Sequence, residues 1–408
     1  MNRIFGIGII LLTVVSACGP KKYKSIGDQQ IVVFADEHLH FAPGKFSDSI
    51  QGLIDTTYRL MDGRLLMKKI KLPVYNREVA ASVKVTVASA GDRWDKSGSC
   101  FVVPSASAIN FIDIHNGKAQ LPEPLPGHEK LKGIAATADY LPAVELIRFM
   151  TPFGVGFYND KMDLRKPVYI PKWEEKAVWE QDVTDRLSLL ENEVWVGIWI
   201  DTWTQEGYTV SMELNFKESP HFCAGKKNTK VMPLLNTVYY MGGQPHPDIF
   251  ARQDLDVQMT IPEDAKNIRL NYITTGHGGH SGGDEFVKKT NIVKIDSEEI
   301  INFIPWRDDC ASFRRFNPGS GVWIIKDSTE YINNETRKYE RKLIEERLAS
   351  SDLSRSNWCP GSDILPVEAK VDKAPGVHTI TISIPEAQPA EGEKLNHWLV
   401  SAYLVWEE

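Results

Sequence analysis

The sequence predicts an all-β protein built from antiparallel sandwiches, and three observations carry this prediction. Tyr208–Phe216 places an apolar residue at every second position, as a strand with one buried face does. Val194–Ile200 is apolar almost throughout, so both of its faces are expected to be covered. Clusters of Gly, Pro and Asn divide the apolar segments, and strands do not alternate with long helices.

Other segments show the same strand pattern, and one shows a different pattern. Further strands are expected over residues 82–87, 266–273, 287–295, 378–384 and 397–406. Residues 334–348 are rich in Glu, Lys and Arg with a thin apolar stripe, which predicts a charged surface helix in a long loop. A second long loop is expected over 104–142, and a domain break between 216 and 228, where Pro and Gly interrupt the strands.

The N-terminus predicts an export signal with a lipid anchor. Basic Arg3 precedes an apolar run, Ile4–Val15, that is too short to span a bilayer. The small residues of Val15–Cys18 resemble the processing site of lipoproteins, so Cys18 is the expected lipidation site. No aspartate follows Cys18, which favours the outer membrane. Export also permits disulfides among four cysteines, whose pairing the sequence alone leaves open: Cys100, Cys223, Cys310 and Cys359.

Size and charge limit the classes of function. The chain has 408 residues, which suggests two or three domains with full cores. Its net charge of −7 lacks the basic footprint of a nucleic-acid-binding protein. We therefore expect no nucleic-acid partner.

The glycine-rich stretch 276–289 contains two chemical signals. Its Gly282–Phe286 letters match the signature of cyclic-dinucleotide synthases, but those enzymes need several helices and cytoplasmic nucleotide, so this reading is rejected. His277 and His280 resemble a metal pair, but the glycines prevent placement on one helix face. Because only Asp284 or Glu285 is near as a third ligand, no metal is predicted. A copper- or iron-dependent oxidase that uses both histidines stays as an alternative.

Carboxylates stand beside tryptophans at several places. Asp95 follows Trp94, and Asp201 precedes Trp203 at the end of an apolar strand. An indole packs on the apolar face of a sugar, and carboxylates accept hydrogen bonds from its hydroxyl groups. A carboxyl group beside an apolar ring can also transfer protons. Each pair alone is equally compatible with a strand-end aspartate and a core tryptophan.

Taken in order, six segments resemble the peptide-N-glycosidase F family, bacterial amidases that remove N-linked glycans from glycoproteins. The segments are residues 92–96, 145–153, 182–185, 201–203, 284–286 and 358–361. The resemblance implies two adjacent antiparallel jelly rolls with the active site in the cleft between them. It places them at residues 65–220 and 221–408, after a signal peptide, 1–17, and an N-terminal extension of uncertain structure, 18–64.

The resemblance also implies the site residues. Three acids are expected to be catalytic. Asp95 is the central acid/base, Glu285 orients water or the amide, and Asp201 binds the sugar core and supports the acid network. Arg355 is expected to stabilise charge on the carbonyl oxygen or to bind substrate. The remaining substrate contacts that the resemblance implies are Trp94, Lys96, Trp203 and Trp358. His277 and His280 match no residue of the family and are expected to touch substrate because they lie near Glu285 in the sequence. Family members have Glu at the Asp201 position and Arg at the Lys96 position, so this chain departs from the pattern at both.

The implied activity is hydrolysis of the amide between an asparagine side chain and the first N-acetylglucosamine, which leaves aspartate. The implied substrates are N-glycoproteins or glycopeptides, with no cofactor and a monomeric enzyme. The resemblance further implies a disulfide between Cys310 and Cys359. The alternative is a non-catalytic glycan-binding lipoprotein, which the shorter acid at Asp201 favours.

Overall fold

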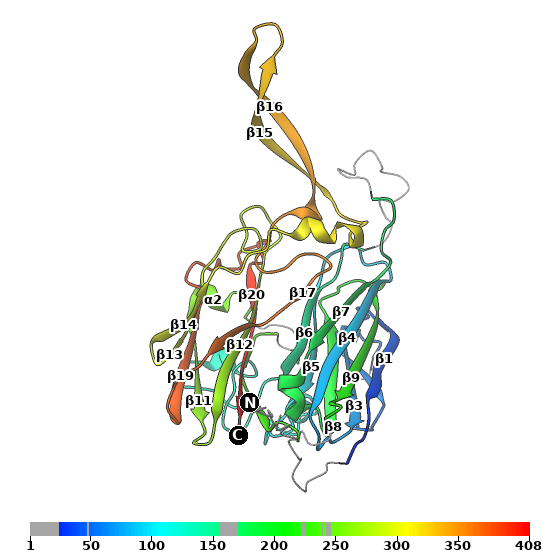
Figure 1. The fold of residues 1–408 in the computed structure, drawn as a ribbon, viewed down its shortest axis with the longest axis vertical. Coiled ribbons are helices and arrows are strands. Elements are labelled where there is room, and N and C mark those ends of the chain that lie inside the picture. Colours follow the sequence, from blue (N-terminus) through cyan, green and yellow to red (C-terminus); the bar gives the residue numbers. More distant parts are fainter. Residues whose placement is uncertain (1–23, 47–48, 155–169, 222–224, 239, 242–245) are drawn as a thin grey trace, which may run out of the picture.

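In the computed structural model, two antiparallel β-sandwiches stand side by side and a long hairpin rises above them (Figure 1). The structure describes residues 24–46, 49–154, 170–221, 225–238, 240–241 and 246–408. The predicted signal peptide, the lipidation site Cys18 and Cys223 lie outside these residues. Among the residues described, no helix is both long and apolar enough to cross a membrane.

The first sandwich faces a sheet of order β1-β9-β4-β7 with a sheet of order β17-β6-β5-β8-β3-β2. The bounds are β1 Gln29–Leu39, β2 Thr57–Leu60, β3 Leu65–Leu72, β4 Val79–Ser89, β5 Ser97–Val103, β6 Val144–Met150, β7 Ala177–Asp182, β8 Asn192–Ile200, β9 Tyr208–Glu218 and β17 Asp363–Ile364.

The second sandwich faces a sheet of order β10-β20-β12-β18 with a sheet of order β11-β19-β13-β14. The bounds are β10 Thr229–Asn236, β11 Leu255–Ile261, β12 Lys266–His277, β13 Asn291–Ile295, β14 Glu298–Phe303, β18 Val367–Lys370, β19 Gly376–Ser383 and β20 His397–Glu407. The helices are short: α1 Phe111–His115, α2 Ile249–Arg252, η1 Met61–Gly63, η2 Glu129–Leu131, η4 Thr184–Leu189, η5 Cys310–Phe316 and η6 Ser350–Asp352.

The predicted all-β class is confirmed, and the patterns that predicted it have the expected physical cause. In β9 every second residue from Tyr208 to Phe216 is buried, because that face packs on the core of the first sandwich. In β8 residues 196–200 are all buried, so both faces of this central strand are covered. Only β13 is shorter than expected, since it begins at Asn291 rather than at 287.

The segment expected to be an N-terminal extension belongs to the first sandwich. Strand β1 pairs with β9, and β2 pairs with β3, so no structural boundary lies between residues 64 and 65. The chain passes to the second sandwich between β9 and β10. The long loop expected over 104–142 carries α1 and η2, and its Leu131 and Ile134 pack in the core of the second sandwich.

A buried ion pair joins the two sandwiches. Arg148 of β6 is paired with Glu145, and both side chains are almost completely buried. The same guanidinium donates to the carbonyl oxygen of Leu399 at 2.5 Å and to the hydroxyl of Thr275 at 3.4 Å, both in the second sandwich. Moving one sandwich relative to the other would break these hydrogen bonds from a buried charge, which is costly. The network therefore favours one arrangement of the two sandwiches.

The predicted surface helix over 334–348 is wrong. The segment forms β16 (Lys338–Ala349), which pairs residue by residue with β15 (Val322–Asn333) in a two-stranded hairpin. Asn333 closes the turn, because its side chain accepts the backbone N–H of Glu335 at 2.9 Å. The Glu, Lys and Arg residues favour a helix locally, but pairing with the β-branched segment that precedes them overrides that weak preference.

The disulfide between Cys310 and Cys359 is present. It closes the loop that carries η5, the hairpin and η6, and therefore ties the root of the hairpin to the body of the protein. Cys100 is buried in β5 and forms no disulfide with any described residue.

Candidate active site

The loop that carries Asp95 connects β4 to β5 and is held by hydrogen bonds on both sides. The Tyr208 hydroxyl donates to the carbonyl oxygen of Trp94 at 2.6 Å, and the Lys96 N–H donates to the Thr151 hydroxyl at 2.8 Å. Asp92, which is 1% exposed, accepts the Trp94 N–H at 3.1 Å. The backbone on either side of Asp95 is therefore fixed, and Asp95 itself lines a pocket.

Glu285 lies in the loop between β12 and β13, and its neighbour Asp284 anchors that loop. The Asp284 carboxylate is fully buried and accepts the Trp398 indole N–H and the Gln388 N–H, each at 2.9 Å. Gly278 closes the loop with a φ of +147°, where an added Cβ would lie 2.3 Å from the Asn396 amide oxygen. Sequence analysis gave Asp284 no role, whereas the structure makes it the residue that holds Glu285 in place.

Arg355 connects the two acids from beneath. Its Nε donates to the Glu285 carboxylate at 2.9 Å, and its Nη2 lies 3.8 Å from the Asp95 carboxylate. The other donors are held by the carbonyl oxygens of Leu353 at 2.7 Å and Ser350 at 2.8 Å. Because the guanidinium is almost completely buried and held on several sides, its position is fixed.

These residues enclose a pocket of about 320 Å³ between the two sandwiches. The exposed indole of Trp94 forms part of its rim. The other walls are Arg93, Asp95, Phe153, Gly279, Glu285, Phe286, Gly319, Gly321, Val322, Trp323, Ser350 and Arg355. A pocket with carboxylates on one side and aromatic rings on another suits a sugar attached to an amide.

Burial shifts the acids toward their neutral forms. Loss of hydration raises the pKa of Glu285 from its ordinary 4.5 to about 7, against the opposing effect of Arg355. Burial also raises the pKa of Asp95, although Arg355 and Lys96 lower it. Because the two carboxyl groups face one guanidinium, a negative charge on Asp95 also raises the pKa of Glu285.

Asp201 lies in a separate cluster. Its carboxylate accepts the Trp203 indole N–H at 3.0 Å and lies 3.6 Å from the Arg64 guanidinium. Arg64 packs over the Trp203 ring at 3.9 Å, and that ring is 56% exposed. The Asp201 N–H donates to Ser97, two residues after Asp95, so the cluster borders the pocket without lining it.

Two residues expected to contact substrate are buried in the protein instead. Trp358 is 2% exposed, donates to the carbonyl oxygen of Gly276 at 2.8 Å and lies beneath Arg355. His277 is 6% exposed, stacks between Trp358 and His397, and has Nε2 within 2.8 Å of the Thr275 hydroxyl. Burial lowers the pKa of His277 well below its ordinary value, so it is a neutral packing residue that cannot touch a ligand in this pocket.

His280 and Lys96 lie near the pocket but not on its walls. The His280 ring nitrogens are within 3.1 Å of the Ser281 carbonyl oxygen and 3.2 Å of the Asn396 amide oxygen. These contacts make His280 part of the loop that positions Glu285. Within the described part of the chain, no three His, Cys, Asp or Glu side chains are placed to hold a metal ion.

Sequence analysis missed two aromatic walls, Phe286 and Trp323. Their rings lie 5.6 Å apart at the opening of the pocket. Phe286 directly follows Glu285, so its position could have been inferred once Glu285 was chosen. Trp323 is the second residue of the apolar run Val322–Ile325, a signal for a strand that the expected helix and loop obscured.

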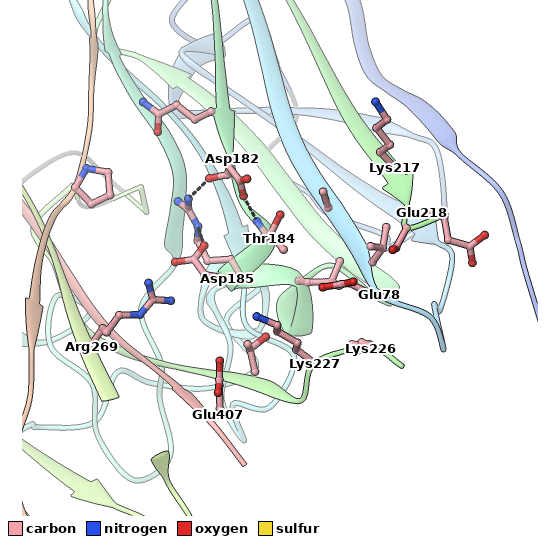
Figure 2. A pocket seen from close by; sticks show the side chains of 18 of the residues that line it. Glu78, Asp182, Thr184, Asp185, Lys217, Glu218, Lys226, Lys227, Arg269 and Glu407 are labelled. Carbon is pink, nitrogen blue, oxygen red and sulfur yellow. Dashed lines mark hydrogen bonds and ion pairs between the residues drawn. The ribbon is translucent and has the colours of Figure 1, made fainter. Parts of the chain in front are cut away.

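A larger concavity lies elsewhere between the sandwiches (Figure 2). It has a volume of about 830 Å³, and none of the described residues that line it is aromatic. Several of its charged groups have structural partners. Asp182 accepts the Thr184 N–H at 2.7 Å, as Figure 2 shows, and Glu368 pairs with Arg269 at 3.1 Å on the surface. This groove has size but no arrangement that suggests catalysis.

Comparisons with known proteins agree with this geometry. Family models described as peptide-N-glycosidase F, N terminal and C terminal, match residues 30–216 and 245–405. Two crystal forms of PNGF-II are 34% and 35% identical over 93% of this chain, with TM-scores of 0.75 and 0.76. The match covers 66% and 65% of those chains, so this chain spans just under two thirds of their length.

A more distant likeness concerns the fold alone. PNGase F, titled a glycosylasparaginase from Flavobacterium meningosepticum, is 13% identical with a TM-score of 0.57, and the match covers 94% of this chain and 96% of that one. A search of curated protein sequences found no match. Because both halves fit the two models in order, and the sandwiches match PNGF-II, this chain belongs to the peptide-N-glycosidase F family.

Proposed function

We propose that this protein hydrolyses the amide between an asparagine side chain and the first N-acetylglucosamine of an N-linked glycan. The observation that carries the proposal is the pair of buried acids, Asp95 and Glu285, on either side of one buried arginine. Family membership supports N-glycan amidase activity in general terms. The pocket adds aromatic walls and a carboxyl group, Glu285, whose pKa is raised to about 7, which amide hydrolysis can use.

The chemistry needs one proton moved and one water added. In the proposed step the ionised acid takes a proton from water, and the water oxygen bonds to the asparagine side-chain carbonyl carbon. The carbon–nitrogen bond then breaks, and the protonated acid supplies a proton to the leaving nitrogen. We assign Asp95 as the base because it lies beside exposed Trp94, and Glu285, with its pKa of about 7, as the acid.

Arg355 acts in this scheme as a positioning residue. The structure leaves it almost no exposed surface, and most of its donors are held by Glu285 and by backbone carbonyl oxygens. It therefore fixes the distance and charge of the two acids rather than capturing substrate. This differs from the role that the resemblance implied, in which Arg355 contacts the substrate directly.

The cluster of Arg64, Asp201 and Trp203 is the proposed contact for the sugar core. The open indole of Trp203 offers a surface for a sugar ring, and the Asp201 carboxylate can accept hydroxyl hydrogen bonds. Its position beside the start of β5 places it next to the pocket. The shorter side chain of Asp201 leaves it 40% exposed, so it stays accessible to ligand.

The test is release of glycan from a denatured N-glycoprotein by the purified protein. We expect free glycan and conversion of the glycosylated asparagine to aspartate, both followed by mass spectrometry. The alternative function, glycan binding without catalysis, rests on the exposed rings of Trp94 and Trp203 and on the shortened Asp201. Tight binding of a glycopeptide with no release, measured by calorimetry in the same buffer, would select that alternative.

Location is proposed on sequence grounds alone. Cys18 would carry the lipid, and the chain would be attached to the outer membrane after removal of residues 1–17. Incorporation of a labelled fatty acid in cells tests this. Label should appear in the wild-type chain and be lost in Cys18→Ser, and equal labelling of both would contradict it.

A further inference from the structure

The β15–β16 hairpin extends away from both sandwiches (Figure 1). Each strand has twelve residues, which corresponds to about 40 Å of extended chain. No other described strand pairs with either outer edge. Two-stranded sheets are only marginally stable by themselves, and open edges invite pairing with another chain. Such an arm is therefore suited to receive an extended polypeptide.

The root of the hairpin is built into the candidate active site. Val322 and Trp323, at the start of β15, line the pocket with Asp95 and Glu285. After β16 the chain enters η6, where the carbonyl oxygen of Ser350 accepts a hydrogen bond from Arg355 at 2.8 Å. A chain leaving the pocket on this side therefore meets the hairpin first.

One face of the root half begins at Trp323, which lines the pocket. Side chains alternate between faces along each strand, so Trp323 and Ile325 share a face with their cross-strand neighbours. Those neighbours include Leu348, opposite Trp323, and the same face continues to Ile344, which lies opposite Asp327. Trp323 is 37% and Ile325 is 38% exposed. Because a two-stranded ribbon twists, the direction of this face changes along the arm, so only its root half continues from the wall that Trp323 forms.

The same face carries negative charge. Glu346 lies opposite Ile325, and Asp327 lies opposite Ile344. Among the described side chains neither acid forms an ion pair. The acids of the opposite face are paired: Glu345 with Lys326 at 3.7 Å, and Glu330 with Arg341 at 3.2 Å. The face that begins at Trp323 is thus apolar and carries two acids without ion-pair partners. Such a face is suited to bind a polypeptide segment that contains both apolar residues and lysine or arginine.

We propose that this face, formed by Trp323, Ile325, Asp327, Ile344, Glu346 and Leu348, binds the polypeptide of the substrate beside its glycosylated asparagine. This rests on the proposed function, because the pocket at its root must take the sugar-bearing asparagine. The bound segment is extended and contains apolar and basic residues. The protein then acts on glycoproteins whose chain is locally unfolded, since a folded surface cannot lie along the ribbon.

The first experiment measures peptide binding without any glycan. The probe is a synthetic ten-residue peptide with alternating leucine and lysine, titrated by calorimetry into the full-length protein. We expect Ile325→Lys with Ile344→Lys to weaken binding by about tenfold or more. The matched control, Ile324→Lys with Leu343→Lys, places the same charge on the opposite face and should bind as the wild type does. Replacing the peptide lysines by glutamate should also abolish measurable binding.

Equal weakening by both double variants, or undiminished binding of the glutamate peptide, would overturn the proposal. Sedimentation of each protein distinguishes peptide binding on this face from binding of a second copy of the chain. Dimers that the Ile325→Lys and Ile344→Lys pair dissolves, together with no peptide binding, would assign the face to a second copy of this chain. Circular dichroism of each variant verifies that the sandwiches are folded.

The second experiment links the arm to catalysis. The ratio of kcat/KM for a long leucine- and lysine-containing glycopeptide to that for a glycosylated tripeptide is expected to fall by about tenfold in the Ile325→Lys, Ile344→Lys variant, through KM. An unchanged ratio would contradict the proposal. If no substrate loses its glycan but the calorimetric result holds, the proposed function fails and the peptide-binding arm stands.

Discussion

The two concavities between the sandwiches differ in size and in the residues that line them, and the smaller one contains the proposed active site. The pocket of about 320 Å³ brings two buried acids and a buried arginine beneath an exposed indole. The groove of about 830 Å³ is lined by charged residues that serve turns and surface ion pairs. Volume thus does not locate a site, whereas charge that is buried and only partly neutralised does.

The origin of this difference lies in the loops. The pocket is formed by the loops after β4, β6, β12 and β16 and by the start of β15 with the residues before it. Buried Asp92 and Asp284 anchor the loops after β4 and β12. The groove is formed by the ends of strands and by η4, which lie at the surface of the protein. Loops held from behind can keep a carboxylate out of water, and strand ends on the surface cannot.

The largest expected effect separates the pocket from the groove directly. Asp95→Asn removes the proposed base at nearly constant shape, and we expect kcat for glycan release to fall by about 10²–10⁴-fold. The matched control in the groove is Glu368→Gln, which breaks one exposed ion pair. Steady-state kinetics should show that control to be indistinguishable from the wild type. A loss of similar size in both variants would break the comparison.

The next prediction tests whether the Cys310–Cys359 disulfide stabilises the part of the protein that forms the pocket. Cys310→Ser with Cys359→Ser opens a loop of 49 residues, and loop-closure entropy predicts a loss of about 4 kcal/mol in the free energy of unfolding. Because the loop carries the hairpin and Arg355, activity should fall together with stability. Urea denaturation monitored by tryptophan fluorescence measures the first and glycan release the second. Full activity in the double variant would show that the pocket needs no such brace.

A smaller effect comes from the raised pKa of Glu285. The folded protein holds this proton up to about pH 7, whereas the unfolded chain releases it near 4.5, so the folded state binds more protons in between. The free energy of unfolding therefore falls as pH rises through that window, by about 1–3 kcal/mol from this group. Glu285→Gln should lack this fall, and Glu368→Gln should keep it. Parallel urea titrations at pH 4.5 and 7 compare the three proteins.

The smallest expected effect concerns the border of the pocket. Trp203→Ala removes the exposed ring of the proposed sugar contact, and KM should rise by about three- to tenfold with kcat nearly constant. Initial rates over a range of glycopeptide concentrations give both constants. A drop in kcat with constant KM would place the ring at the reaction itself rather than at the sugar core.

The sequence predicted the sandwiches well because their signal is local. Alternation in 208–216 and 378–384 directly records which face is buried. The hairpin was missed because the structure of residues 338–349 depends on pairing with residues 5 to 27 positions earlier in the chain, while their own preference is helical. Asp95 was found through its neighbour Trp94 and the family resemblance, and Glu285 through the resemblance alone. The sequence did not predict that Trp358 and His277 are buried, because burial beneath the site produces no alternation or periodicity in the residues around them.

The most direct measurement of the central claim is the fate of the asparagine in heavy-oxygen water. A glycopeptide is incubated with the wild-type protein and with Asp95→Asn, and the peptide product is analysed by mass spectrometry. If the pocket hydrolyses the amide, the wild type yields aspartate carrying one oxygen from the solvent, and the variant leaves the glycosylated asparagine intact. Asparagine that retains a sugar after wild-type treatment, or unchanged conversion by Asp95→Asn, would contradict the account.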